Sequence, residues 1–156
     1  MPGNFLAGGS AGFLGVQMRG LDTLSLRVKY MIRAAQAGLK EGVDQAAFIF
    51  EAAARQNSPV DTGANRDSIY TEELVRSLSG EVYQLKISPH MPYSKRLEYG
   101  FVGADSLGRV YHQQPRPYMR PAFDENKDDA RQVIKETVLE AVQQAGLSAA
   151  ARRASR

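Results

Sequence analysis

The chain has 156 residues and a mass of 17.1 kDa, with 43% apolar and 24% charged residues, which suits one compact domain with a modest hydrophobic core. It contains no cysteine, which excludes disulfides, thiolate metal sites and cysteine nucleophiles, and with two histidines no metal or other cofactor is expected. The net charge of +3 equals the charge of the last twelve residues, so the body lacks the concentrated basic face of a nucleic-acid-binding domain.

The first twenty residues hold six of the fourteen glycines, and so glycine-rich a segment loses too much backbone entropy to form a regular element by itself. It is either a floppy leader or an arm that orders against a neighbouring subunit. We favour the arm, because four large apolar side chains would be costly to leave in water. These are Phe5, Leu6, Phe13 and Leu14. No stretch of the chain is apolar over a length that spans a membrane, and no membrane partner is expected.

A long amphipathic helix is predicted from Val28 to Gln56, because apolar residues recur there at steps of three and four. The expected buried stripe is Ile32, Ala35, Leu39, Val43, Ala46, Phe50 and Ala53, and charged residues such as Asp44, Glu51 and Arg55 lie mostly off it. Gly38 and Gly42 each weaken such a helix by about 1 kcal/mol, which a bend or the close approach of another backbone would explain. The Ser58-Pro59 pair ends the helix.

Two strands are predicted after a turn at residues 61–63. Residues 68–78 and 81–88 are strand-like, and the short Ser79-Gly80 link between them is typical of an antiparallel hairpin. Residues 93–99 fit a short helix that Gly100 closes, and residues 100–114 fit a loop with a strand around Val110 to His112.

The prolines at 115, 117 and 121 bracket an extended segment, and a second long helix is expected from about Pro121 to Ala145, ended by Gly146. The elements together predict an α+β fold, with long N-terminal and C-terminal helices packed on a small antiparallel sheet. We expect residues 1–20 to form a flexible arm, residues 21–145 a single domain, and residues 146–156 a frayed basic tail.

Asp61-Thr62-Gly63 matches the triplet of aspartic proteases, in which a homodimer brings two carboxylates together to activate water. The catalytic triplet follows a hydrophobic strand, whereas here it follows a helix end and Pro59. We therefore interpret it as a helix-ending turn whose Asp61 accepts backbone N–H groups, and keep a homodimeric protease as the alternative function.

Aromatic and basic residues gather between positions 93 and 120. Such residues suit protein–protein interfaces, could stack on bases or bind phosphates, or could simply border the sheet. We favour a protein–protein surface, because acidic residues interleave with the bases. The set comprises Tyr93, Lys95, Arg96, Tyr99, Arg109, Tyr111, Arg116, Tyr118 and Arg120.

Three segments in order carry a resemblance to a known family: residues 58–69 (SPVDTGANRDSI), 93–100 (YSKRLEYG) and 114–123 (QPRPYMRPAF). The chain resembles the small neck or tail-completion proteins of long-tailed bacteriophages, which are also labelled minor tail components. Those proteins begin with a long helix and a Pro-Val-Asp-Thr-Gly turn, continue with Glu-(Tyr/Phe)-Gly, and end with an Arg-Pro run into a last helix. The resemblance covers about residues 21–144, and Asn65 departs from it where the family usually has Leu.

The resemblance implies a structural role at the joint between capsid and tail, not an enzymatic one. It implies a ring of copies, for example a hexamer, around a channel through which DNA passes without sequence-specific binding. Its partners would be head-closure or connector proteins on one side and tail-terminator or tail-tube proteins on the other, in a virion made in the host bacterial cytoplasm. Two other roles stay open: a channel component that touches DNA with its basic tail, and a host-directed regulator that needs no ring.

The resemblance also implies that the motif residues have structural or interaction roles. Arg116, Tyr118 and Arg120 could lock the last helix onto the sheet or face a neighbour. The full set is Pro59, Asp61, Thr62, Gly63, Tyr93, Glu98, Tyr99, Gly100, Arg116, Pro117, Tyr118, Arg120 and Pro121.

Overall fold

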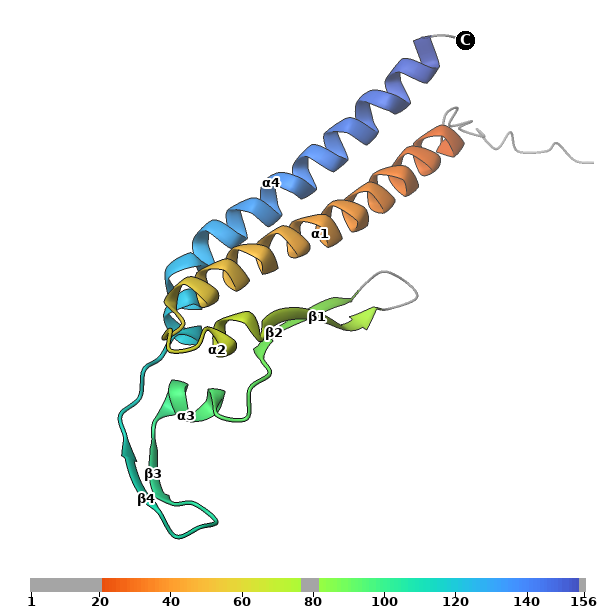
Figure 1. Ribbon diagram of the computed structural model, residues 1–156. Coiled ribbons are helices and arrows are strands. Elements are labelled where there is room, and N and C mark those ends of the chain that lie inside the picture. Colours follow the sequence, from red (N-terminus) through yellow and green to blue (C-terminus); the bar gives the residue numbers. More distant parts are fainter. Residues whose placement is uncertain (1–20, 77–81, 155–156) are drawn as a thin grey trace, which may run out of the picture.

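The computed structural model describes residues 21–76 and 82–154 and confirms the α+β class (Figure 1). The elements in chain order are α1 (Leu21–Asn57), α2 (Ala64–Asp67), β1 (Ile69–Arg76), β2 (Tyr83–Pro89), α3 (Ser94–Tyr99), β3 (Phe101–Ala104), β4 (Val110–Gln113) and α4 (Met119–Ala154). The arm expected at residues 1–20 and the Ser79-Gly80 link lie outside the described residues.

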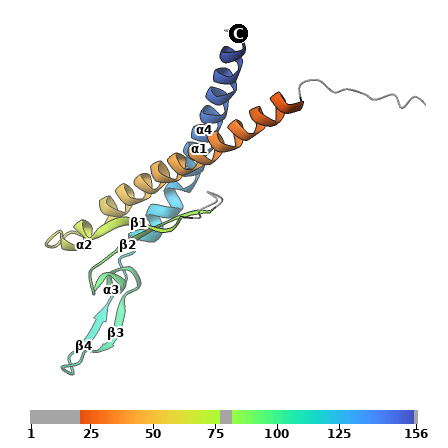
Figure 2. The same cartoon turned by 90° about the vertical axis from the view of Figure 1, so that its right-hand side faces the viewer.

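The two long helices α1 and α4 run antiparallel and side by side (Figures 1 and 2). Two glycines of α1 face the backbone of α4 directly. A Cβ added at Gly38 would lie 2.8 Å from the Cβ of Ala141, and one added at Gly42 would lie 2.9 Å from the Cα of Ile134. The two glycines therefore permit a close approach of the α4 backbone, which is one of the two explanations that the sequence offered.

The predicted apolar stripe of α1 is buried only over part of its length. Ala46 is buried, Ala53 is half-buried, and the Phe50 ring stacks on Phe123 of α4 with the ring centroids 5.2 Å apart. Toward the N-terminus of α1, however, Ile32 is 52% exposed and Leu39 is 38% exposed. This part of the stripe has no covering element in the described chain.

The hydrophobic core lies where the end of α1, the start of α4 and the β1–β2 hairpin meet. Its fully buried residues are Ala54, Ile69, Tyr118 and Ala122, and Ala53, Ile87, Leu97 and Met119 pack against them. Strands β1 and β2 pair antiparallel from Ile69 opposite Pro89 to Arg76 opposite Tyr83, with a bulge between Glu73 and Val75. The core thus contains α1, α3, α4 and the first hairpin.

The segment predicted as a loop at residues 100–114 is instead a second antiparallel hairpin. β3 pairs with β4 from Phe101 opposite Gln113 to Ala104 opposite Val110, and the hairpin projects away from α1 (Figures 1 and 2). The strand expected near Val110 is present, but β3 was missed because it is four residues long and contains Gly103. The described strands therefore form two separate two-stranded sheets instead of one.

The predicted bounds of the last helix were wrong at both ends. α4 begins at Met119, so Pro121 lies in its first turn, where a proline is tolerated because no intrahelical N–H is needed there. At the other end α4 continues through Gly146 to Ala154. The following residues include a run of alanine, the strongest helix former, which offsets the cost of one glycine.

Candidate functional site

The Glu98 side chain caps the N-terminus of α4. Its Oε2 accepts the backbone N–H groups of Tyr118 at 2.8 Å and Met119 at 3.0 Å, and its Oε1 accepts that of Arg120 at 3.1 Å. Pro121 has no N–H, and the next residue, Ala122, donates to the Tyr118 carbonyl at 3.4 Å within the helix. All the donors that a helix start leaves unpaired are thus accounted for, and the negative charge also suits the helix dipole.

Gly100 lets the chain turn sharply after α3 and pass close to the end of β4. Its φ of 74° favours glycine, and an added Cβ would lie 2.8 Å from the Gln113 carbonyl oxygen and 3.0 Å from the Pro115 nitrogen. In the same place the Arg116 N–H donates to the Leu97 carbonyl at 2.7 Å. The two segments 93–100 and 114–123 therefore form one folded unit.

The three residues Arg116, Tyr118 and Arg120 have different surroundings. Tyr118 is fully buried in the core, whereas Arg116 and Arg120 are exposed. Tyr118 thus joins the start of α4 to the core within one chain. The two arginines lie on the surface, available to a neighbour.

The Asp61-Thr62-Gly63 turn joins α1 to the short helix α2. Gly63 has a φ of 81°, and Thr62 Oγ1 accepts the Ala64 N–H at 3.4 Å, so the acceptor role expected of Asp61 belongs to Thr62. Asp61 is exposed, and both flanking elements are helices instead of the strand that precedes a protease triplet. Nothing in this geometry favours the protease alternative.

A buried polar group lies directly behind this turn. Asn65, 4% exposed, donates to Ser58 Oγ at 3.0 Å and accepts from Ser94 Oγ at 2.6 Å. It therefore ties the end of α1 and the start of α3 to α2 through hydrogen bonds, where a leucine could offer only apolar contact. This polar junction was not predicted from the sequence, which showed only a departure from the family pattern.

Charged side chains of α1 that lie off its predicted apolar stripe hold the first hairpin. Arg55 donates to the Ile69 carbonyl from Nε at 3.0 Å and from Nη2 at 2.7 Å, and it pairs with Glu51 at 3.0 Å. Glu51 Oε2 accepts the Thr71 hydroxyl at 2.7 Å. These contacts bind β1 along one side of α1.

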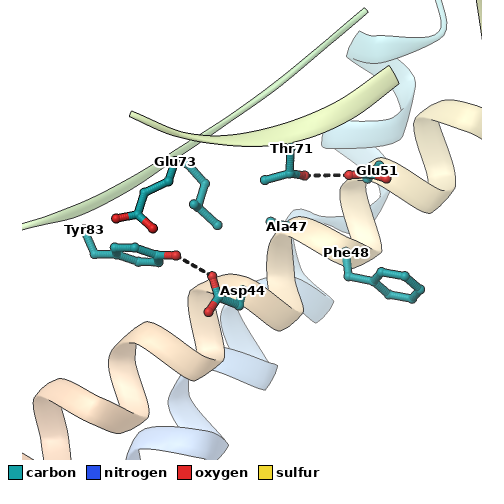
Figure 3. Close-up of a pocket in the computed structure, with 8 residues that line it drawn as sticks. Asp44, Ala47, Phe48, Glu51, Thr71, Glu73 and Tyr83 are labelled. Carbon is teal, nitrogen blue, oxygen red and sulfur yellow. Dashed lines mark hydrogen bonds between the residues drawn. The ribbon is translucent and has the colours of Figure 1, made fainter. Parts of the chain in front are cut away.

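Residues of α1 and of the first hairpin line an open groove of about 330 Å³ (Figure 3). The Tyr83 hydroxyl reaches across it and donates to Asp44 Oδ1 at 2.7 Å. Its volume is at the lower end of the range for ligand pockets, ~300–1,000 Å³. We call it the acidic groove; its residues are Asp44, Ala47, Phe48, Glu51, Thr71, Glu73, Tyr83 and Leu85.

The loop of the second hairpin is organised around Asp105. Its Oδ1 accepts the N–H groups of Leu107 at 2.9 Å and Arg109 at 3.0 Å, and its Oδ2 accepts Arg109 Nε at 2.7 Å and the Tyr111 hydroxyl at 3.2 Å. The Arg109 N–H is the main cause that lowers the pKa of Asp105 from its ordinary value. The pKa of Tyr111 is raised, first by desolvation and then by its bond to Asp105.

Within the described ranges, no three His, Cys, Asp or Glu side chains are grouped so that they could hold a metal ion. None of the described helices has the length and apolar character needed to cross a membrane.

Comparison with known proteins identifies the family. A family model described as "Bacteriophage HK97-gp10, putative tail-component" matches residues 23–100, half of the chain. Neither the curated proteins nor the solved structures give a significant match. The chain belongs to the HK97-gp10-like family, which places it among structural tail components of bacteriophages and confirms the resemblance seen in the sequence.

Proposed function

We propose that this protein is a structural part of the phage neck, where copies of it form a ring around the DNA channel and join the capsid connector to the tail. The observation that supports the proposal best is the amount of apolar surface that one copy leaves exposed on its projecting parts. Apolar patches larger than a few hundred Å² are uncommon on monomeric proteins and mark interaction surfaces.

On the long helices, most of the exposed large apolar residues lie far from the core. They include Leu24, Leu26, Val28, Tyr30, Met31 and Ile32 on α1, and Leu139 and Leu147 on α4. A single copy has no described element that covers them. Neighbouring copies, or the head-closure and tail-terminator proteins on either side, would bury this surface in the assembled neck.

A ring also explains why the subunit has one well-packed junction from which the helix ends and the second hairpin project. The Glu98 cap and the Tyr118 core fix the junction of the helices with both hairpins, while the helix ends and the second hairpin extend from it (Figure 1). Such a subunit can present different patches to the two neighbours of a cyclic assembly. DNA would pass through the opening without base contacts.

Quantitative mass spectrometry of purified virions tests this function. We expect the same copy number in every particle, as a closed ring requires. Deletion of the gene should leave filled heads and tails unjoined until the protein is supplied in trans. Infectious particles that lack the protein would contradict the proposal and favour a host-directed regulator.

A further inference from the structure

The second hairpin presents a compact apolar surface. Three of its large side chains, two on the strands and one in the turn, are mostly exposed: Val102 by 74%, Val110 by 68% and Leu107 by 75%. Arg109 precedes Val110 in the same hairpin, bonds to Asp105, and has a side chain that is 64% exposed. We call these four residues the hairpin knob. Burying three such side chains against a partner removes apolar surface from water, so the knob has a tendency to associate.

The knob is held in one conformation before it meets a partner. The four hydrogen bonds to Asp105 fix the loop, and the Arg96 guanidinium stacks on Phe101 at 4.2 Å from the ring centroid, at the base of the hairpin. A surface that is already ordered loses little conformational entropy when it binds. The hairpin is therefore built like a docking element.

The acidic groove has the complementary character. Ala47, Phe48 and Leu85 give it apolar walls, and Phe48 is 72% exposed. Asp44 and Glu51 are engaged by hydrogen bonds and ion pairs within the chain, whereas Glu73, an exposed residue on the hairpin side, has no ion-pair partner in the described residues. An incoming basic side chain would find Glu73 free.

We propose that the hairpin knob of one copy docks in the acidic groove of the next copy, with Arg109 facing Glu73. The proposal rests on the proposed assembly and names the two patches that it needs. Charge favours a second copy as the occupant: the knob presents the exposed guanidinium of Arg109, whereas the groove is lined by three carboxylates and no base.

The geometry allows this contact only between copies. The knob projects away from α1, while the groove lies between α1 and the first hairpin, so the knob does not reach its own groove (Figures 1 and 2). A contact between two different patches repeats from copy to copy and closes into a ring when the rotation allows. Asp105 leaves the two terminal nitrogens of Arg109 available, because it binds only Nε and the backbone N–H.

Cysteine cross-linking in assembled particles tests the contact. Because the chain has no native cysteine, a thiol reagent reacts only with the cysteines introduced into it. The test chain carries Phe48→Cys and Leu107→Cys. The matched control carries Phe48→Cys and Leu147→Cys, because Leu147 is 71% exposed but lies at the far end of α4. After incorporation into virions, a short bifunctional thiol reagent should give a ladder of multimers with the test chain and none with the control.

A double-mutant cycle provides the second measurement. Glu73→Gln and Arg109→Gln should each lower incorporation into particles, and the loss in the double variant should be about fivefold smaller than the product of the two single losses, which matches the upper range of about 1 kcal/mol for a surface ion pair. The cycle cancels the effect of Arg109→Gln on its own partner Asp105, because that effect is the same in both backgrounds. This measurement tests the knob–groove contact if the cysteine variant folds but is not incorporated into particles.

The outcomes separate this contact from the assembly itself. An incorporated test chain that gives no ladder, a ladder from the control, or losses of the two single variants that simply multiply in the double variant would overturn the knob–groove contact but not the ring. A protein absent from the particle would overturn the proposed function instead.

Discussion

The carboxylate of Glu98 lies 2.8 Å from the backbone nitrogen of Tyr118, whose side chain is fully buried. One residue of α3 thus fixes the start of α4, while the residue it binds fills the core. The Glu-Tyr-Gly segment at residues 98–100 and the Arg-Pro-Tyr-Met-Arg-Pro segment at residues 116–121 are separate in sequence but pack together in one joint. The projecting second hairpin is held on the body by this joint.

Loss of the cap should destabilise the whole fold. Glu98→Ala leaves the N–H groups of Tyr118, Met119 and Arg120 without their acceptor, and we expect the free energy of unfolding to fall by about 1–2 kcal/mol. Urea denaturation followed by circular dichroism measures it. Lys95→Ala, at an exposed position of the same helix, is the control and should change stability by less than about 0.5 kcal/mol. Equal effects of the two changes would show that Glu98 has no capping role.

Alanine substitution should change stability in opposite directions at two glycines of the long helices. Gly38→Ala places a methyl 2.8 Å from Ala141 Cβ and should destabilise by about 1–3 kcal/mol, despite the better helix propensity of alanine. Gly146→Ala meets nothing within 4 Å and should stabilise by up to about 1 kcal/mol. Thermal unfolding of the two variants distinguishes them; a stabilising Gly38→Ala would mean that the helices do not pack closely there.

The buried hydroxyl of Tyr118 has no hydrogen-bond partner among the described residues. Tyr118→Phe keeps the ring and removes a polar group, so stability should be unchanged or rise by about 1 kcal/mol. Tyr118→Ala empties the core and should cost about 3–5 kcal/mol. A large loss with Tyr118→Phe, measured by the same denaturation, would reveal a partner of the hydroxyl and contradict this account.

The order of the hairpin loop should depend on pH through Asp105. Because its pKa is lowered from 3.8 in the folded state, the ionised form stabilises the loop above that value, and the contribution disappears as pH falls through the lower folded value. The amide resonances of Leu107 and Arg109 should therefore stay constant from neutral pH to about 4 and shift below it. Asp105→Asn should shift them at every pH. A transition near neutral pH would contradict the assignment to Asp105.

The sequence predicted the features that hydrophobic periodicity and the positions of glycine indicate. The step of three and four residues in α1 gave a long helix, and the alternation of Tyr83, Leu85 and Ile87 gave a strand. The cost of glycine in a helix indicated either a bend or a close approach at Gly38 and Gly42, and the structure shows the close approach. These features are local, so a single segment is enough to show them.

Long-range contacts escaped prediction for a physical reason. Nothing local shows that Glu98 caps a helix twenty residues later, or that Asp44 and Glu51 turn toward a hairpin instead of solvent. The buried Asn65 likewise needs Ser58 and Ser94, which only the fold brings to it. The acidic groove depends on two elements at once, and no motif marked it.

The most direct test of the structural role is to locate the protein in the particle. Cryo-electron microscopy of virions, with the protein tagged at the end of α4, should show a ring of copies at the junction of capsid and tail. Density for the protein outside that junction, or its absence from mature particles, would contradict the account.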